Sequence, residues 1–210
     1  MKSEKKQFFS ARNITYLAVL TALVIVLQVF GGYLKIGATT LSFVLVPIVL
    51  SGMIMGVIPA LILGIIFGLV VIFDALGGLD PFTLYLINEQ PFLTVLLCLV
   101  KGGAAGACSA LLFKLVAKKN KYVAAFVAAA AAPIINTGIF VLGALCMSEP
   151  ISAFLSGAGL DLTGLSPFYI ILVLCVGVNF FVELAINLIC APALYTVDGV
   201  VGKRLKAKNK

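Results

Sequence analysis

The chain alternates between long apolar runs and short polar segments. The runs span roughly 18 to 25 residues, and a helix of that length crosses a hydrocarbon core of about 30 Å. The second run is the shortest, because Pro47 and the closely spaced Gly56 and Pro59 interrupt it. The pattern predicts an all-α integral membrane protein with six transmembrane helices, at about residues 12–31, 43–56, 58–77, 91–116, 122–147 and 167–197.

Basic residues gather at the segments that six spans would place on one side of the membrane. They precede the first span, join the fourth to the fifth and follow the sixth: Lys2, Lys5, Lys6, Arg12, Lys114, Lys118, Lys119, Lys121, Lys203, Arg204, Lys206, Lys208 and Lys210. The opposite segments hold one lysine and four acids: Lys35, Asp80, Glu89, Glu149 and Asp161. Because cytoplasmic loops carry an excess of Lys and Arg, both termini are predicted to be cytoplasmic.

Composition narrows the class of protein further. Of the 210 residues, 62% are hydrophobic and 11% are charged, about half the charged fraction of a soluble domain. We therefore expect a single transmembrane domain over residues 1–210, whose first apolar run is a retained helix rather than a signal peptide. The net charge of +7 follows from the topology. Nucleic acid is not an expected partner, since the basic tails are short and lack interleaved aromatic residues.

Several chemistries are excluded by residue types and motifs that the chain lacks. It has no histidine, which excludes histidine-based catalytic triads and histidine metal sites. Its five cysteines are scattered through apolar runs without CxxC spacing, so we expect them to be small buried side chains. The sequence contains no GxxxxGKS/T phosphate loop for ATP hydrolysis. We expect no catalytic residue, no metal and no cofactor.

Polar residues recur inside the predicted spans. Asn179, Glu183 and Asn187 follow one another at four-residue spacing, which places them on one face of the last helix. Lys101 lies about ten residues into the fourth span, so its backbone is roughly 15 Å deep. Ionisable groups at such a depth are costly and tend to be functional. Asn187 lies nearest the cytoplasm and fits a role in helix packing better than one in ligand contact.

The fifth predicted span brings Asn136 and Thr137 to a similar depth, just after Pro133. Together these spans predict a small-molecule pocket that opens outward beneath lid loops at residues 31–41 and 74–91. Its predicted substrate-binding residues are Lys101, Asn136, Thr137, Asn179, Glu183 and, from the second loop, Asn88. The alternative interpretation is structural: Lys101 pairs with Glu183, and the amides bond neighbouring helices.

Small residues also recur at four-residue spacing, a pattern that permits close helix contact. Ala18 and Ala22 form such a pair in the first span, and glycines repeat it as Gly52/Gly56, Gly64/Gly68 and Gly102/Gly106. The glycine pairs predict tight packing inside the bundle. A six-span chain with neither an ATP site nor a convincing inverted repeat fits a binding subunit that takes its energy from elsewhere.

Several stretches together resemble one family over essentially the whole chain. They are the Ala18-xxx-Ala22 element, VPIVLSGMIMG at 46–56, the following GIIFGLVV, KGGAAGACSALLFKL, APIINTGIF and NFFVELAINLICAPAL. With six spans and both ends inside, the chain resembles the substrate-binding S components of bacterial energy-coupling factor (ECF) vitamin transporters.

The resemblance implies a role and a set of partners. An S component of the bacterial plasma membrane captures a small-molecule vitamin from outside, within the lipid bilayer. It then associates with a membrane-embedded coupling (T) subunit and two cytoplasmic ATPase subunits, which hydrolyse the ATP. Ala18 and Ala22 match the alanines that contact the coupling subunit in this family. The chain itself is therefore expected not to be an enzyme.

The sequence narrows the choice of vitamin only in part. The absence of tryptophan disfavours thiamine. Lys101 would suit an anionic ligand, which favours pantothenate, while riboflavin stays open because S components with a similar passage between the second and third spans bind it. Two other function classes are also open. One is a stand-alone secondary transporter or channel with Lys101 and Glu183 as a coupling pair. The other, an enzyme with Glu183 as general base, lacks a partner nucleophile or metal.

Overall fold

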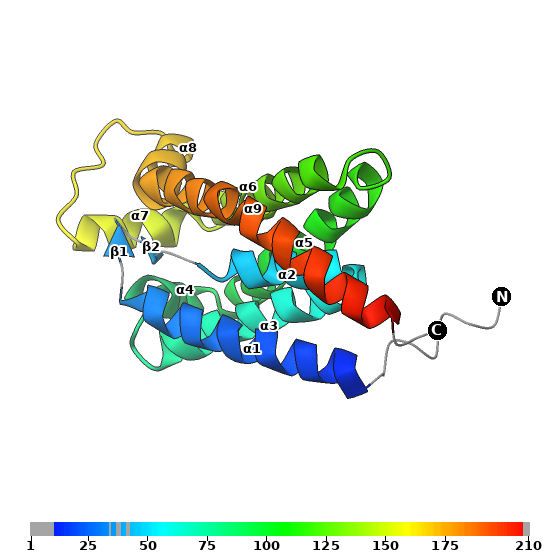
Figure 1. Ribbon diagram of the computed structural model, residues 1–210. Coiled ribbons are helices and arrows are strands. Elements are labelled where there is room, and N and C mark those ends of the chain that lie inside the picture. Colours follow the sequence, from blue (N-terminus) through cyan, green and yellow to red (C-terminus); the bar gives the residue numbers. More distant parts are fainter. Residues whose placement is uncertain (1–10, 34, 37–38, 41–42, 208–210) are drawn as a thin grey trace.

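The computed structural model describes residues 11–33, 35–36, 39–40 and 43–207. Long helices lie side by side in a bundle, with shorter elements at one end (Figure 1). In chain order the elements are α1 (Ala11–Gly32), β1 (Lys35–Ile36), β2 (Thr39–Thr40), α2 (Leu45–Met55), α3 (Val57–Leu76), α4 (Pro81–Glu89), α5 (Pro91–Val116), α6 (Lys121–Leu145), α7 (Ser148–Gly157), α8 (Pro167–Tyr169), η1 (Ile170–Val176) and α9 (Gly177–Ala207). The strands pair antiparallel in a two-stranded sheet.

Among the residues that the structure describes, five helical segments are long and apolar enough to cross a membrane. They follow the predicted first, third, fourth, fifth and sixth spans closely: 13–32, 57–76, 91–116, 121–145 and 167–201. The predicted second span is the shorter helix α2, whose 11 residues extend only about 16 Å. It ends at Gly56, whose φ of 97° favours glycine and turns the chain directly into α3. The six-span count and the single domain therefore stay predictions.

The two ends of the bundle differ in their elements (Figure 1). The start of α1, the connection between α5 and α6 and the end of α9 lie together at one end, which we call the basic end. The opposite end carries α4, α7 and the β1–β2 hairpin, and we call it the cap end. This layout is the one that alternating spans require.

Part of the predicted charge pattern can be followed at the basic end. Lys118 and Lys119 are exposed there, between α5 and α6. The remaining basic termini lie outside the described residues or among helix ends whose side chains are not described: Lys2, Lys5, Lys6, Arg12, Lys203, Arg204, Lys206, Lys208 and Lys210. The cytoplasmic location of both termini stays a prediction.

Helices α3 and α5 cross with their backbones in close contact. A Cβ added at Gly64 would collide with the carbonyl oxygen of Gly102, and one added at Gly106 would collide with that of Ala60. Only glycine allows so near an approach, so the tight packing predicted for these glycines is confirmed. The crossing fixes the backbone on which Lys101 stands.

The cap end is a small apolar cluster formed between α4, α7 and η1. The rings of Phe82 and Phe154 meet edge to face, with centroids 5.3 Å apart. Ile151 and Ile171 are fully buried in the same cluster. The predicted lid loop 74–91 is therefore partly wrong, since half of it forms helix α4 and its first residues still belong to α3. The local reason is Asp80, which caps the helix, followed by a proline at its first position.

The last span is interrupted, which the predicted continuous span 167–197 did not anticipate. A π-helical segment, η1, leads to Gly177, whose φ of 15° and ψ of −114° break the regular helix before α9. Single π-helical turns occur often at functional sites, because they displace side chains from regular helical positions. Here the segment directs Cys175 and Val176 toward the interior of the bundle.

Candidate functional site

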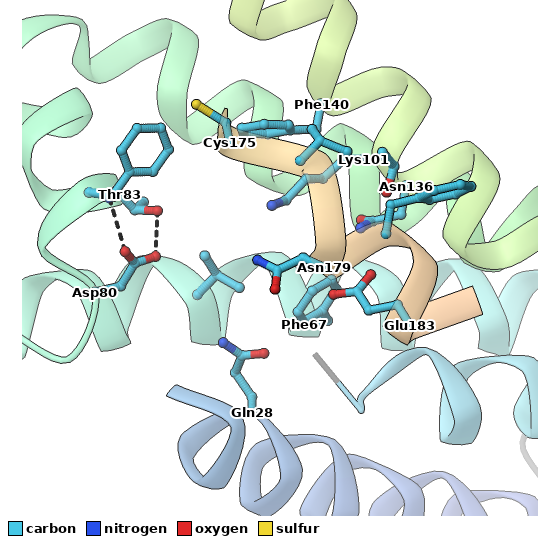
Figure 2. A pocket seen from close by; sticks show the side chains of 15 residues that line it. Gln28, Phe67, Asp80, Thr83, Lys101, Asn136, Phe140, Cys175, Asn179 and Glu183 are labelled. Carbon is cyan, nitrogen blue, oxygen red and sulfur yellow. Dashed lines mark hydrogen bonds between the residues drawn. The ribbon is translucent and has the colours of Figure 1, made fainter. Parts of the chain in front are cut away.

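A cavity lies inside the bundle beneath the cap end (Figure 2). Its interior of about 80 Å³ is several times the roughly 10–15 Å³ that one water molecule needs. Residues of α1, α3, α5, α6, η1 and α9 form its wall, and residues at the start of α4 line its cap-side end. The lining residues are Gln28, Phe67, Val71, Asp80, Phe82, Thr83, Lys101, Asn136, Thr137, Phe140, Cys175, Val176, Asn179, Phe180 and Glu183.

Most of the predicted site residues meet at this cavity. Helix α5 contributes Lys101, α6 contributes Asn136 and Thr137, and α9 contributes Asn179 and Glu183. These residues are up to 82 positions apart in the sequence (183 − 101), so only the packing of three helices brings them together. Their role in binding stays a prediction, but their convergence on one cavity is a feature of the structure.

Two predicted polar residues lie elsewhere. Asn88 is exposed on α4 and is not among the residues that line the cavity. Asn187 is fully buried one helical turn below Glu183, and its amide donates a hydrogen bond of 2.8 Å to the Glu183 carbonyl oxygen. This local bond is consistent with the packing role predicted for Asn187.

Charged groups of both signs face the cavity. The amine of Lys101 points into it, and its Nζ lies 5.3 Å from the centroid of the Phe140 ring (Figure 2). Attraction to the ring face is worth about 0.5–2 kcal/mol, more where the ammonium is desolvated. Asp80 and Glu183 supply two carboxylates, both more than nine-tenths buried. A direct pairing of Lys101 with Glu183 stays a prediction.

Two buried amide oxygens at the cavity have no hydrogen-bond partner within the described part of the chain. They are Oε1 of Gln28 and Oδ1 of Asn136, in side chains only 4% and 7% exposed. An unsatisfied buried polar atom costs about 1–3 kcal/mol. A bound molecule that donates hydrogen bonds to these oxygens would remove that cost, so both atoms indicate a polar occupant.

The walls between the polar groups are largely aromatic. Phe67, Phe140 and Phe180 line the cavity together with Val71 and Cys175. Ligand pockets commonly combine such apolar walls with a few polar groups, because apolar burial drives binding while the polar groups fix orientation. The arrangement suits a small organic molecule with polar ends.

Sequence reasoning missed the polar residues at the cap end of the cavity. Gln28 interrupts the apolar first span, and that isolated amide was the available signal. Taken singly, Asp80 is typical of a charged outer loop and Thr83 carries no signal of its own. The Asp-Pro-x-Thr spacing of a helix start would have predicted that these two side chains bond to each other.

The predicted partner-contact residues lie on the outer face of α1. Ala18 and Ala22 are both exposed, and so are Ile14, Val19 and Val26 on the same helix. No described element covers this strip. In a membrane it faces either lipid or another membrane subunit.

These features define a multi-pass helical membrane protein with a cavity inside the bundle that is lined by polar and aromatic side chains. The sequence profile of one family, described as "ECF transporter, substrate-specific component", matches residues 12–195. The chain therefore belongs to the substrate-specific components of ECF transporters. No curated protein and no solved structure matches the chain.

Membership of this family confirms several predictions. The resemblance to S components is correct, and the chain is a transport subunit that resides in a membrane and crosses it several times. Family membership also implies a small-molecule substrate and partner subunits of an ECF transporter.

Proposed function

We propose that the chain captures a vitamin in the cavity beneath the cap end and that the cap end faces the outside. On this proposal the transmembrane domain extends over residues 1–210, with both termini in the cytoplasm. A membrane-embedded coupling subunit and two cytoplasmic ATPase subunits would then drive uptake with ATP.

The observation that carries this proposal is the Lys101 amine, which points into a cavity whose other walls combine polar side chains with aromatic and aliphatic ones. A desolvated ammonium favours an anionic partner, and a carboxylate of the ligand would satisfy it. Asn136 adds a different contact, because its buried amide oxygen has no partner in the described chain and would accept a hydrogen bond from an N–H or O–H of the ligand. Among vitamins, a carboxylate partner for Lys101 favours pantothenate. Riboflavin, which has no carboxylate, is the second candidate because the passage between the second and third spans resembles that of riboflavin-binding S components.

The two carboxylates at the cavity are compatible with an anionic ligand. Asp80 already accepts two hydrogen bonds from Thr83 at the start of α4. Figure 2 shows Asp80 and Thr83 on one side of the cavity and Glu183 on the other, with the Lys101 amine between them. A ligand carboxylate held at Lys101 therefore need not lie against either acid.

Native mass spectrometry of the purified protein tests the proposal directly. We expect a co-purified molecule with the mass of pantothenate, and a saturable binding curve when pantothenate is added back to the ligand-free protein. A co-purified riboflavin would replace the substrate but keep the function. Failure to bind any vitamin would contradict the proposal.

Uptake by proteoliposomes distinguishes this function from that of a stand-alone transporter. Vesicles that contain only this chain should bind substrate without accumulating it, because the chain has no phosphate loop for ATP hydrolysis. Accumulation should require the coupling subunit, the ATPases and ATP. Uptake by the chain alone, driven by a proton or sodium gradient, would instead support a secondary transporter that uses Lys101 and Glu183.

A further inference from the structure

The cap-side end of the cavity carries a group of polar side chains that the proposed carboxylate contact does not use. They are Gln28 on α1 and Asp80 and Thr83 at the start of α4. All three are at least about nine-tenths buried. Figure 2 shows Asp80 and Thr83 across the cavity from Asn136 and Glu183, with Gln28 nearest to the α1 wall. We call these three residues the cap-side subsite.

The hydrogen bonds of Asp80 and Thr83 leave this subsite rich in acceptors. The backbone N–H of Thr83 donates to Asp80 Oδ1 at 3.1 Å, and the Thr83 hydroxyl donates to Asp80 Oδ2 at 2.5 Å. The one hydroxyl proton of Thr83 is therefore occupied. Each carboxylate oxygen can accept more than one hydrogen bond, and so can the hydroxyl oxygen. Asp80 and Thr83 therefore offer hydrogen-bond acceptors, and no free donor, to the cavity.

Gln28 adds a third acceptor. Its side chain hydrogen-bonds to the carboxylate of Asp74 on α3, which uses an amide N–H as the donor. Its Oε1 is buried, lines the cavity and has no partner within the described residues. The Asp74 contact thus orients the amide so that the oxygen is the atom left for a ligand.

The opposite requirement holds around Lys101. An ammonium has three donors and no acceptor, so it needs oxygens from the ligand. The cap-side subsite needs donors, and the nearby carboxylates of Asp74 and Asp80 disfavour an anionic group there. A ligand that meets both requirements is asymmetric and can bind in one orientation only.

We infer that the cap-side subsite selects hydroxyl or amine groups, so that the substrate is a small molecule with hydrogen-bond donors at one end and an anionic group at the other. The donors would lie against Gln28, Asp80 and Thr83, and the anion against Lys101. This inference rests on the proposed function of the cavity and adds the chemical class and orientation of the substrate.

Matched ligands separate the two ends. Pantothenate carries two hydroxyls at one end and a carboxylate at the other. N-(3,3-dimethylbutanoyl)-β-alanine keeps the carboxylate and lacks both hydroxyls, while pantothenol keeps the hydroxyls and lacks the carboxylate. Calorimetric titration of the full chain in detergent would measure the affinity for each. We expect pantothenate to bind at least about tenfold more tightly than either analogue, as the loss of one or two buried hydrogen bonds implies.

Variants assign each end to its residues. Gln28→Leu should weaken pantothenate binding about tenfold. It should leave the affinity for N-(3,3-dimethylbutanoyl)-β-alanine, which has no hydroxyls, unchanged. Lys101→Met should weaken the binding of pantothenate and leave the affinity for pantothenol unchanged. Gln90→Leu makes the same change outside the cavity and should leave all affinities unchanged. If Gln28→Leu does not fold, the unbranched Gln28→Met serves in its place.

The outcomes separate this inference from the proposed function. Equal affinity for pantothenate and for N-(3,3-dimethylbutanoyl)-β-alanine would overturn the inference. The proposal that the cavity binds a substrate with a carboxylate would still stand. Binding of riboflavin alone, which carries no anionic group, would replace the proposed substrate and overturn the anionic contact at Lys101. The role of the cap-side subsite would then be supported if Gln28→Leu weakens the binding of riboflavin more than that of lumichrome, which lacks the ribityl hydroxyls. Equal changes in the two affinities would overturn it. Binding of none of these compounds would overturn both proposals.

Discussion

Lys101 on α5 and Phe140 on α6 form a cation–π contact, with the ammonium 5.3 Å from the ring centroid. A lysine within a membrane helix usually extends toward the nearest water, because its long side chain can carry the charge there. The Phe140 ring instead offers the charge a favourable neighbour inside the bundle. The amine therefore stays at the cavity, where it can meet a ligand.

Removal of this charge should weaken ligand binding without unfolding the bundle. We expect Lys101→Ala to lower the affinity for pantothenate roughly 10- to 100-fold, since hydrogen bonds to charged groups contribute about 1.5–3 kcal/mol. Asn136→Ala should cost about tenfold at most, because that amide is neutral. Titration calorimetry measures both, with Lys114→Ala as the control, a lysine exposed at the basic end of the same helix. Unchanged affinity in both site variants would mean that Lys101 and Asn136 serve helix packing and not ligand binding.

The α3–α5 crossing should tolerate no side chain at its centre. Gly64→Ala places a Cβ against the backbone of Gly102, which cannot yield as a flexible side chain would. We expect a loss of about 1–3 kcal/mol in unfolding free energy, the usual cost of overpacking. Gly138→Ala is the matched control, since a Cβ there meets nothing within 4 Å. Thermal unfolding in detergent compares the two, and equal midpoints would show that the crossing can relax.

The exposed face of α1 should decide assembly rather than binding. Ala18→Trp or Ala22→Trp adds a large ring where two membrane helices would need to approach closely. We expect either change to prevent co-purification with the coupling subunit and to leave vitamin affinity unchanged. Leu142→Trp, at an exposed position on α6, controls for the added bulk. Normal assembly of both alanine variants would place the partner contact elsewhere.

The ion pair between Lys121 and Asp198 should hold α6 and α9 together at the basic end. Asp198 is only 3% exposed, whereas Lys121 is 45% exposed. The Tyr122 and Tyr195 rings meet beside the pair, with centroids 5.3 Å apart. Lys121→Met would leave a buried carboxylate without its cation, at a cost of about 1–3 kcal/mol.

The double variant Lys121→Met/Asp198→Asn tests that explanation. It removes the buried charge as well as its partner, so it should recover part of the stability that Lys121→Met loses. Denaturant or thermal unfolding would show the recovery as a higher midpoint than that of the single variant. A double variant less stable than the single one would mean that the carboxylate is satisfied by other groups.

Some of the binding cavity could be read from local spacing. Asn179 and Glu183 share a face because four residues advance a helix by slightly more than one turn. The depth of Lys101 and Asn136 followed from counting residues along apolar runs. Each inference concerns a single helix, whose geometry in a membrane is set by the need to satisfy its own backbone hydrogen bonds.

Other parts of the cavity could not be read in this way. Gln28 and Asp80 belong to elements that join the site only through helix packing. Gln28 has no polar residue at helical spacing, and the spacing of Asp80 and Thr83 indicates a helix start and not a cavity. The sequence also did not predict the helix break at Gly177, because a glycine in an apolar run is equally compatible with a continuous helix. Asn88 lies in the expected segment, but the rotation of α4 exposes it and turns Phe82 and Thr83 inward.

The sequence by itself determined the class of this protein. Apolar run lengths established a helical membrane protein, and motifs along the whole chain indicated an ECF S component, which the family match confirmed. Only the tertiary structure decided which polar groups face one cavity and which atoms they leave unsatisfied. The reason is physical: periodicity specifies a face of one helix, whereas the neighbour of that face depends on contacts such as Gly64 with Gly102 between distant segments.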